Sequence, residues 1–199
     1  MIKKLALRVA RERQKKIYKK LFQTHKESFK SLHWSNKENQ KIRFDILLEV
    51  GNITNKKILD IGSGMGDFFG YIDSKNIKAK MTGYEIVEEF VKISKNRYPK
   101  HSFELIDLSK IDISEKFDFV FSSGIFAFGN KTFFETMIKK SFSICKIAYA
   151  FNFYNSTKDK RFMSISKTEI EKILIELKPS KIVQKSDYLE NDTTFFIYK

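Results

Sequence analysis

This sequence contains very little cysteine and histidine, and it lacks long apolar runs. Cys145 is the only cysteine, which excludes an internal disulfide, and its apolar surroundings predict a buried, inert thiol. The three histidines (His25, His33 and His101) are scattered, so no zinc or other metal site is predicted. No apolar run approaches the roughly 20 residues that a membrane span needs, and no signal-peptide core follows the basic N-terminus. We therefore expect a cytoplasmic protein without a membrane span.

Proline is also scarce, with two residues in 199, while 42% of the residues are hydrophobic. This composition is typical of a folded globular protein and excludes a disordered one. The length suits one domain with a substantial core and is too short for two ordinary domains.

Acidic residues are few relative to basic ones, and the imbalance is concentrated at one end. The formal net charge is +14, and residues 1–31 supply +9 of it. Such a segment suits an anionic partner, either a nucleic acid or an anionic membrane surface. It is equally typical of a solvated helix in a lysine-rich chain, and the composition leaves these interpretations open.

Residues 2–31 have the pattern of a helix, but their apolar stripe is narrow. It consists of Ile2, Leu5, Val9, Ile17 and Leu21. The stripe is interrupted between residues 12 and 16, which predicts a kink or loose packing there. A second helix is expected after Ser35, which has capping-box spacing with Glu38, and Gly51 is expected to end it in a left-handed conformation.

From residue 56 onward, short apolar runs alternate with helical patterns. Strands are expected near residues 56–61, 79–86, 101–108, 117–124 and 144–153. A capping box of Ser166 and Glu169 begins a further helix, and the chain ends in an antiparallel strand pair. This alternation predicts an α/β fold with a mostly parallel sheet and helices on both faces. We expect residues 51–199 to form this domain and residues 1–50 to form a basic helical extension and cap.

Three glycines follow the first of these strands, in the order Asp60, Gly62, Gly64, Gly66. A phosphate-binding P-loop would end in Gly-Lys-Ser/Thr, but Asp67 and Phe68 stand there. A dinucleotide fingerprint would place its third glycine where Asp67 lies, and a carboxylate there would repel a pyrophosphate. The pattern favours a ligand that is cationic and carries no phosphate, as S-adenosylmethionine is.

Two further acids end the next two strands. Glu85 follows Asp60 by 25 residues, the position at which a carboxylate accepts hydrogen bonds from ribose hydroxyls in nucleotide-binding folds. Asp107 ends the third strand and could accept a bond from an adenine amine. Because ligands of open α/β sheets bind at the carboxyl ends of the strands, these acids and the glycines are expected to share one site.

With these motifs, residues 33–199 resemble class I S-adenosylmethionine-dependent methyltransferases. The resemblance rests on LDIGSGMG (59–66), GYE (83–85), IDL (106–108) and FDFVFSSG (117–124). More narrowly, WSNKENQKIRF (34–44), SGIF (123–126), NF (152–153) and the closing DYLENDTTFFIYK resemble a group of small bacterial methyltransferases. That group is associated with small-molecule and surface-polysaccharide modification, including phosphoramidate decoration of capsules. The resemblance implies a Rossmann-like sheet of seven strands with the last one inserted antiparallel.

Carried onto this chain, the resemblance implies roles for matching positions. The expected cofactor-binding residues are Asp60, Gly62, Ser63, Gly64, Gly66, Glu85, Ile86, Asp107, Leu108 and Ser122. Gln40 and Arg43 lie on one helical face and are expected to hold the cofactor carboxylate or close the roof of the pocket, although the polar face of a surface helix looks the same. Trp34 is either a wall of the pocket or a hydrophobic staple.

The acceptor side is less well defined by the sequence. Ser123, Phe126, Asn152 and Tyr154 follow the fourth and fifth strands and are expected, with Trp34, to face the acceptor. His33 is a weak candidate for a general base, and no stronger one is evident. An anionic acceptor such as a phosphate or carboxylate needs no base, which agrees with that lack.

Three functions remain open at this point. The first is methylation of a small molecule or glycan precursor by direct displacement, for example O-methylation of a capsule phosphoramidate or sugar. The second is methylation of RNA, with residues 1–31 holding the backbone. The third is a non-catalytic cofactor-binding subunit whose N-terminal helix docks on a partner protein.

Overall fold

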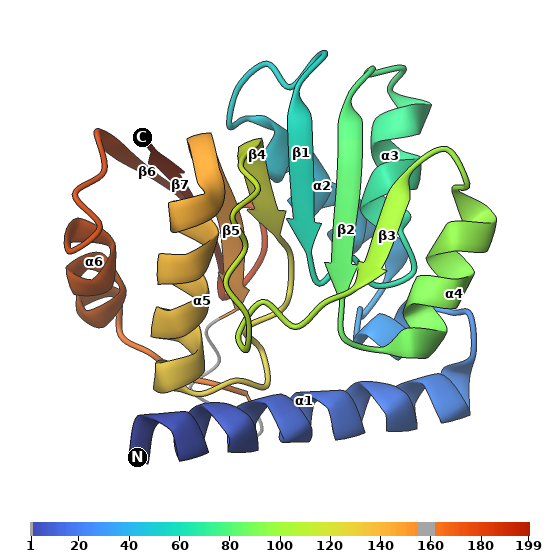
Figure 1. Cartoon of the computed structure of the whole chain (residues 1–199), viewed down its shortest axis with the longest axis horizontal. Coiled ribbons are helices and arrows are strands. Elements are labelled where there is room, and N and C mark those ends of the chain that lie inside the picture. The colour runs from blue at the N-terminus through green and yellow to red at the C-terminus, as the bar shows by residue number, and fades with distance from the viewer. Residues whose placement is uncertain (1, 155–161) are drawn as a thin grey trace.

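The computed structural model describes residues 2–154 and 162–199. The strands are β1 (Lys57–Ile61), β2 (Lys80–Glu85), β3 (Ser102–Leu105), β4 (Phe117–Ser122), β5 (Cys145–Tyr154), β6 (Lys181–Lys185) and β7 (Asp192–Tyr198). The helices are α1 (Ile2–His25), α2 (Lys37–Leu48), α3 (Asp67–Ser74), α4 (Glu88–Arg97), α5 (Lys131–Ile144) and α6 (Lys167–Ile175), with a 3-10 turn, η1, at Phe29–Leu32. Figure 1 shows these elements arranged around one central sheet.

The described residues form a seven-stranded sheet in the order β3-β2-β1-β4-β5-β7-β6. The first five strands in this order are parallel, so neighbouring strands are joined by crossover connections rather than by tight hairpins. β7 is antiparallel to both of its neighbours and lies between β5 and β6, so the last strand is inserted rather than added at the edge. The predicted sheet, with its antiparallel last strand, is confirmed.

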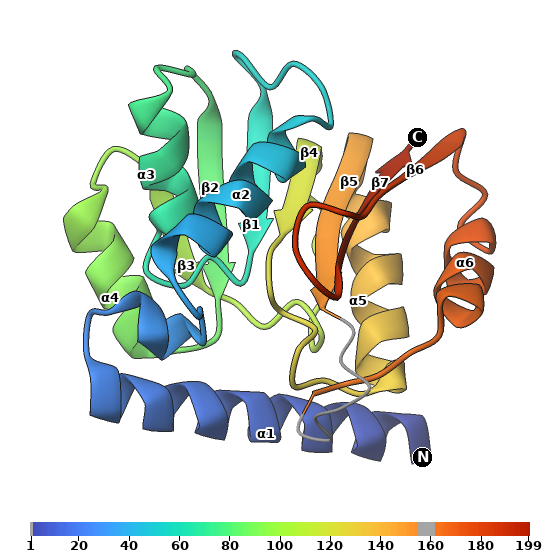
Figure 2. The same ribbon diagram turned by 180° about the vertical axis from the view of Figure 1, so that it is seen from behind.

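Alternate residues of each strand supply two hydrophobic cores, one on each face of the sheet. In β5, for example, Tyr149, Phe151 and Phe153 belong to one core while Ala148 and Ala150 belong to the other. Helices α5 and α6 cover the first face, and α2 and α3 cover the second, which Figure 2 shows from behind. Helices on both faces were expected from the alternation of strand and helix patterns along the sequence.

Helix α1 does not extend away from the domain but lies across the carboxyl ends of the strands (Figures 1 and 2). It is a single helix from Ile2 to His25, so the predicted kink is wrong. Within residues 12–16 Gln14 is buried and the other four side chains are exposed, and Arg11 and Gln14 face the domain while Ile2, Leu5 and Val9 are exposed. The stripe expected to pack inward is therefore partly on the outside.

Several predicted boundaries differ from the structure. α1 ends at His25, before η1, rather than near residue 31. The N-cap of α2 is Asn36, whose side chain accepts a hydrogen bond from Asn39 N at 2.7 Å, and not Ser35, one residue earlier. α2 ends at Leu48, and Gly51 lies beyond it at φ +141°, outside the conformation of a left-handed cap. The capping box of Ser166 and Glu169 is confirmed.

None of the helices among residues 2–154 and 162–199 is both long enough and apolar enough to cross a bilayer.

The aromatic core beneath the sheet gives a direct test of this packing. Phe151 on β5 is fully buried and contacts the rings of Phe126, Phe134 and Phe195, with centroids 5.3 to 5.9 Å away. Phe151→Ala is expected to lower the free energy of unfolding by about 3–5 kcal/mol, because it leaves a cavity that its neighbours cannot fill. Ile175→Ala on α6, where the side chain is 65% exposed, is the control and should change it by under about 0.5 kcal/mol in urea unfolding. Equal effects would contradict this assignment of the core.

Candidate functional site

A cavity of about 680 Å³ lies at the carboxyl ends of β1, β2, β4 and β5. Its walls come from α1, η1, α2, the glycine loop after β1 and the turns that follow β2 and β4. The predicted residues that line it are His33, Trp34, Gln40, Arg43, Asp60, Gly62, Ser63, Gly64, Glu85, Ile86, Leu108, Ser123, Phe126, Asn152 and Tyr154. The fold thus brings together residues that are widely separated in the sequence, at the edge of the sheet where ligands of such folds bind.

The glycine loop allows the backbone to approach other elements closely. Gly62 has φ +76° and Gly64 has φ +53°, values that L side chains rarely adopt. A Cβ at Gly62 would lie 2.3 Å from Cγ2 of Ile125, and one at Gly64 would lie 2.9 Å from Cδ2 of Leu32. The two glycines therefore let the loop lie against the turn after β4 and against η1 while its backbone lines the cavity.

Glu85, at the end of β2, is the most tightly held acid of the cavity. Its Oε1 accepts hydrogen bonds from the backbone N–H groups of Ile86 at 2.6 Å and Val87 at 2.9 Å, and its Oε2 accepts one from Gly64 at 2.9 Å. Burial raises the pKa of the Glu85 carboxyl, while these N–H groups oppose the rise. Glu85 therefore fixes the glycine loop to the turn after β2.

Asp60, at the end of β1, shares the floor of the cavity with Glu85. Burial raises the pKa of the Asp60 carboxyl to about 8, and the Glu85 carboxylate adds to that rise. Ionisation of Asp60 beside Glu85 is therefore unfavourable in the free chain, and a cation bound next to it would stabilise the ionised carboxylate. This agrees with the prediction of a cationic ligand from the glycine pattern.

Asp107 lies outside the cavity lining, so its expected contact with the adenine amine is not supported by its position. Its Oδ1 accepts hydrogen bonds from Arg11 Nε at 3.1 Å and from Ser109 Oγ at 2.6 Å. Burial would raise the pKa of Asp107, but the Arg11 guanidinium and the Ser109 hydroxyl hold it below its ordinary value. The carboxylate anchors α1 to the turn after β3 instead of facing a ligand.

Two other predicted residues also lie outside the lining. Ser122 is fully buried, and its hydroxyl forms a 2.6 Å hydrogen bond with Tyr149 inside the core, so it cannot line the transfer site. Gly66 is the N-cap of α3, and a Cβ there would lie 2.7 Å from the Tyr98 ring. Its role is to let α3 begin close to the tyrosine.

The turn after β4 is tied to β5 by one buried amide. Asn152 Nδ2 donates to Ser123 Oγ at 3.2 Å, and Asn152 Oδ1 accepts from the backbone N–H of Gly124 at 3.0 Å. Asn152 is 2% exposed, so its orientation is fixed by these bonds. Both predicted residues therefore form a rigid section of the cavity wall.

Helix α2 brings Gln40 and Arg43 to the cavity, but each is already bound to an acid. Gln40 Nε2 donates to Asp67 Oδ2 at 2.9 Å. Arg43 forms an ion pair with Asp192, and its guanidinium lies 4.7 Å from the centroid of the Trp34 ring. A ligand carboxylate at Arg43 would therefore compete with a buried partner.

Aromatic side chains form the opposite wall. Trp34 lines the cavity and also packs edge-on against Phe44 of α2. It stands two residues before the N-cap Asn36, outside the N′ position that a hydrophobic staple uses. His33 has φ +62° and stacks edge-on against Phe128 and Phe162. Phe162 also contacts Tyr154, which extends this aromatic wall to the end of β5.

The sequence interpretation missed the part of the site that α1 supplies. Arg11, Gln14 and Tyr18 all line the cavity, and Gln14 Nε2 donates to the carbonyl of Ile125 at 2.8 Å. Burial raises the pKa of the Tyr18 hydroxyl, and the Glu85 carboxylate adds to the rise. Positions 11, 14 and 18 share one helical face, and this polar spacing was the available signal.

Within residues 2–154 and 162–199, no cluster of three or more His, Cys, Asp or Glu side chains is arranged to hold a metal ion.

Residues 58–147 match a family model described as a methyltransferase domain. A curated relative, "Putative methyltransferase 235L" of Invertebrate iridescent virus 6, is 32% identical over 69 residues, which are 35% of this chain. The match spans about a quarter (26%) of the viral protein.

Solved structures are similar over nearly the whole chain. Magnesium protoporphyrin IX methyltransferase from Synechocystis PCC 6803, with SAH bound, has a TM-score of 0.68 at 15% identity and covers 92% of this chain and 93% of its own. A S-adenosylmethionine-dependent methyltransferase from Clostridium acetobutylicum ATCC 824 has a TM-score of 0.65 at 12% identity, covering 91% and 98%. The fold is therefore the Rossmann-like methyltransferase fold that the sequence predicted.

The raised pKa of Asp60 predicts a pH dependence of stability. Its carboxyl has a pKa of about 8 in the folded chain against 3.8 ordinarily, so the folded state keeps a proton that the unfolded state loses. The free energy of unfolding should therefore fall as the pH rises from about 4 to about 8, by at most about 1.4 kcal/mol per pH unit.

Asp60→Asn should flatten this dependence, measured by urea unfolding at several pH values without ligand. Asp112→Asn, at a side chain that is 97% exposed, is the matched control and should keep the wild-type slope. An Asp60→Asn variant as steep as the wild type would contradict the assignment.

Proposed function

We propose that this chain is a S-adenosylmethionine-dependent methyltransferase that acts on a small molecule or glycan precursor. The observation that carries the proposal is the cavity at the carboxyl edge of the sheet, whose floor combines the glycine loop with two buried carboxyls. The methyltransferase family match over residues 58–147 and the fold support the same reaction class.

The residues of the floor fit this cofactor. A carboxylate can accept about four hydrogen bonds, and backbone N–H groups use three of those of Glu85. One acceptor position is left for a ribose hydroxyl. Asp60 would face the positive charge of the ligand, and Gly62 and Gly64 would let the methionine part lie against the backbone. When bound, S-adenosylmethionine supplies a methyl group on a cationic sulfur, which is a good leaving group.

The other residues of the cavity would position the acceptor and exclude water. The rigid Asn152–Ser123 pair and the aromatic wall of Trp34 and Tyr154 would hold it in line with the methyl group. The cavity volume of about 680 Å³ lies within the range typical of small-molecule sites, about 300–1,000 Å³. The Synechocystis relative, a protein of the same fold and similar coverage, is named for a small-molecule acceptor.

An acceptor that is already anionic fits this wall best, because proton removal would then not be needed. His25 and His33 both line the cavity, and the His33 ring is packed between two phenylalanines. A phosphoramidate, phosphate or carboxylate of a surface-glycan precursor is therefore the acceptor class that we propose, together with reaction in the cytoplasm.

The domain boundary at residue 50 stays a prediction, since α1 and α2 share the cavity with the rest of the chain.

Replacement of Glu85 tests the cofactor site. Glu85→Ala should weaken S-adenosylmethionine binding by about tenfold or more, because it removes the ribose acceptor and frees the glycine loop. Trp34 is the only tryptophan and lines the cavity, so its fluorescence can report binding. Glu104→Ala, at an exposed residue of β3, is the control. Unchanged affinity in a folded Glu85→Ala variant would contradict the assignment.

Transfer of labelled methyl from S-adenosylmethionine into cell extract tests the reaction. Label that enters small molecules or glycans and resists ribonuclease is the expected result, and Glu85→Ala should reduce it at subsaturating S-adenosylmethionine. Ribonuclease-sensitive label would replace the proposal with an RNA methyltransferase. Cofactor binding without transfer, together with a stable complex with another protein, would indicate a non-catalytic subunit.

A further inference from the structure

The outer face of α1 carries an exposed aliphatic stripe, which consists of Ile2, Leu5 and Val9. These side chains are 84%, 53% and 57% exposed. The spacing of three and four residues places them on one side of the helix, roughly opposite Arg11 and Gln14, which are buried against the domain. Single exposed aliphatic residues are common, but three in a row along one helical face form a continuous apolar surface.

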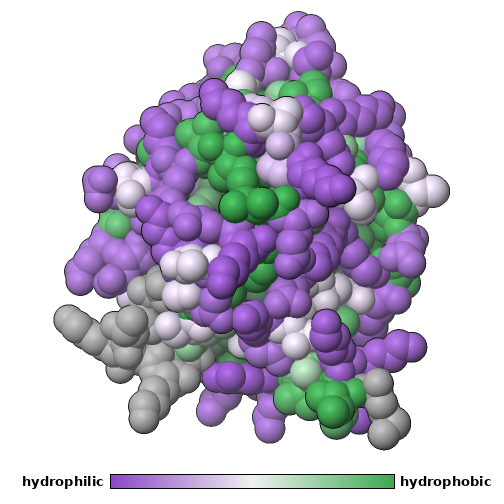
Figure 3. Space-filling view, turned by 90° about the vertical axis from the view of Figure 1, so that its left-hand side faces the viewer, coloured by the Kyte–Doolittle hydropathy of each residue, from purple (hydrophilic) through white to green (hydrophobic). Residues whose placement is uncertain are grey.

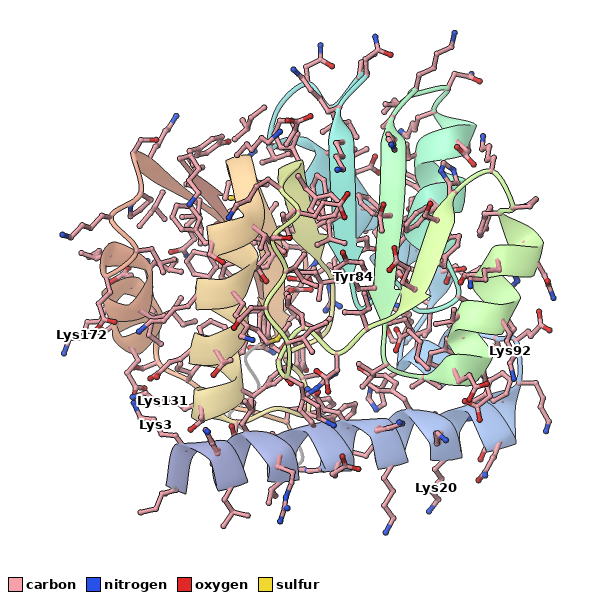
Figure 4. All side chains as sticks on the ribbon, viewed as in Figure 1. Lys3, Lys20, Tyr84, Lys92, Lys131 and Lys172 are labelled. Atoms are coloured by element: carbon pink, nitrogen blue, oxygen red, sulfur yellow. The ribbon has the colours of Figure 1, made fainter. Side chains whose placement is uncertain are left out.

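Basic side chains surround this aliphatic stripe. Arg8 borders it on one side, and Arg13, Lys16 and Lys20 continue the same face toward the C-terminal end of α1. Among residues 2–25, Glu12 is the one acid against nine lysines and arginines, and Glu12 itself lies 3.7 Å from Lys110. Lys20 extends from α1 away from the sheet (Figure 4), and hydrophobic atoms gather among hydrophilic ones at the lower edge of Figure 3, where the N-terminal end of α1 lies.

We propose that the outer face of α1 binds the surface of an anionic phospholipid bilayer. A helix that lies in a bilayer interface combines an aliphatic side with lysines and arginines at its edges, and it is not hydrophobic overall. Here Ile2, Leu5 and Val9 would enter the acyl boundary while the lysines contact anionic headgroups. The proposal is independent of the methyl-transfer reaction.

Two other occupants fit this face less well. A second copy of the chain would place two such basic helices against each other, and their charges would repel. RNA would match the charge, but single-stranded RNA is bound by stacking bases on aromatic rings. The aromatic side chains of α1, Tyr18 and Phe22, point inward against Phe128 and Phe90. The aliphatic stripe thus favours lipid.

Because the inner face of α1 covers the cavity, binding of its outer face to a bilayer would also affect the cavity. Arg11, Gln14 and Tyr18 of α1 line the cavity. A bilayer bound to the outer face of α1 would therefore hold in place the helix that covers the cavity. The carboxyl edge of the sheet would then face the membrane.

Co-sedimentation of the full chain with vesicles tests the proposal. The wild type should pellet with vesicles of phosphatidylcholine and phosphatidylglycerol at low salt, and not with phosphatidylcholine alone. The double variant Leu5→Ser/Val9→Ser should bind about tenfold more weakly or worse, and Lys16→Gln/Lys20→Gln should bind more weakly with a smaller dependence on salt. Ile175→Ser, at a similarly exposed aliphatic residue on α6, is the matched control.

Circular dichroism and Trp34 fluorescence with S-adenosylmethionine verify that the variants are folded, since Leu5 and Val9 lie outside the cavity lining. Absence of binding to the anionic vesicles by the wild type would overturn the proposal, as would equal binding by Leu5→Ser/Val9→Ser. Tight binding of single-stranded RNA without vesicle binding would assign the face to RNA. A dimer that is lost in Leu5→Ser/Val9→Ser would assign it to a second copy.

Discussion

The carboxylate of Glu85 is the constraint on which the rest of the site depends. It is buried at the end of β2 and accepts three backbone N–H bonds, two from its own turn and one from Gly64. Backbone donors in a loop with positive φ have few alternative partners, so a single side chain fixes the path of the glycine loop. Because that loop packs against Ile125 and Leu32, the same carboxylate also sets the separation of β1 from the turn after β4 and from η1.

Keeping Glu85 charged in this setting affects its neighbour. Burial raises the pKa of Asp60, and the Glu85 charge raises it further, to about 8. The folded chain therefore holds a site in which the second carboxyl is protonated over much of the neutral range. A cationic ligand would lower the pKa of Asp60 again, since it favours the ionised carboxylate. The acidic residues that argued against a phosphate ligand in the sequence therefore favour a cationic ligand in the structure.

The sequence was sufficient for those parts of the site that are local. The glycines and Glu85 lie at strand ends that the alternation of elements locates, and the sheet then brings them together. Asp107, Ser122 and Arg43 could not be assigned in this way, because each is bound by a partner far along the chain: Arg11 for Asp107, Tyr149 for Ser122 and Asp192 for Arg43. A strand-end carboxylate that faces a ligand and one that faces an arginine have the same local sequence. Only tertiary packing separates them.

Helix α1 shows the same limit most clearly, because polar side chains lie among apolar ones on its inner face while three aliphatic residues lie outside. Arg11 and Gln14 are inside and Ile2, Leu5 and Val9 are outside. Burial of polar side chains is tolerated only where they find partners, and here Asp107 and the carbonyl of Ile125 supply them. Leu7, Ala10 and Phe22 add apolar contacts to these hydrogen bonds on the inner face, so Ile2, Leu5 and Val9 are not needed to attach the helix to the domain. Those residues are then free to serve a second surface, and the lysines around them restrict that surface to one of negative charge.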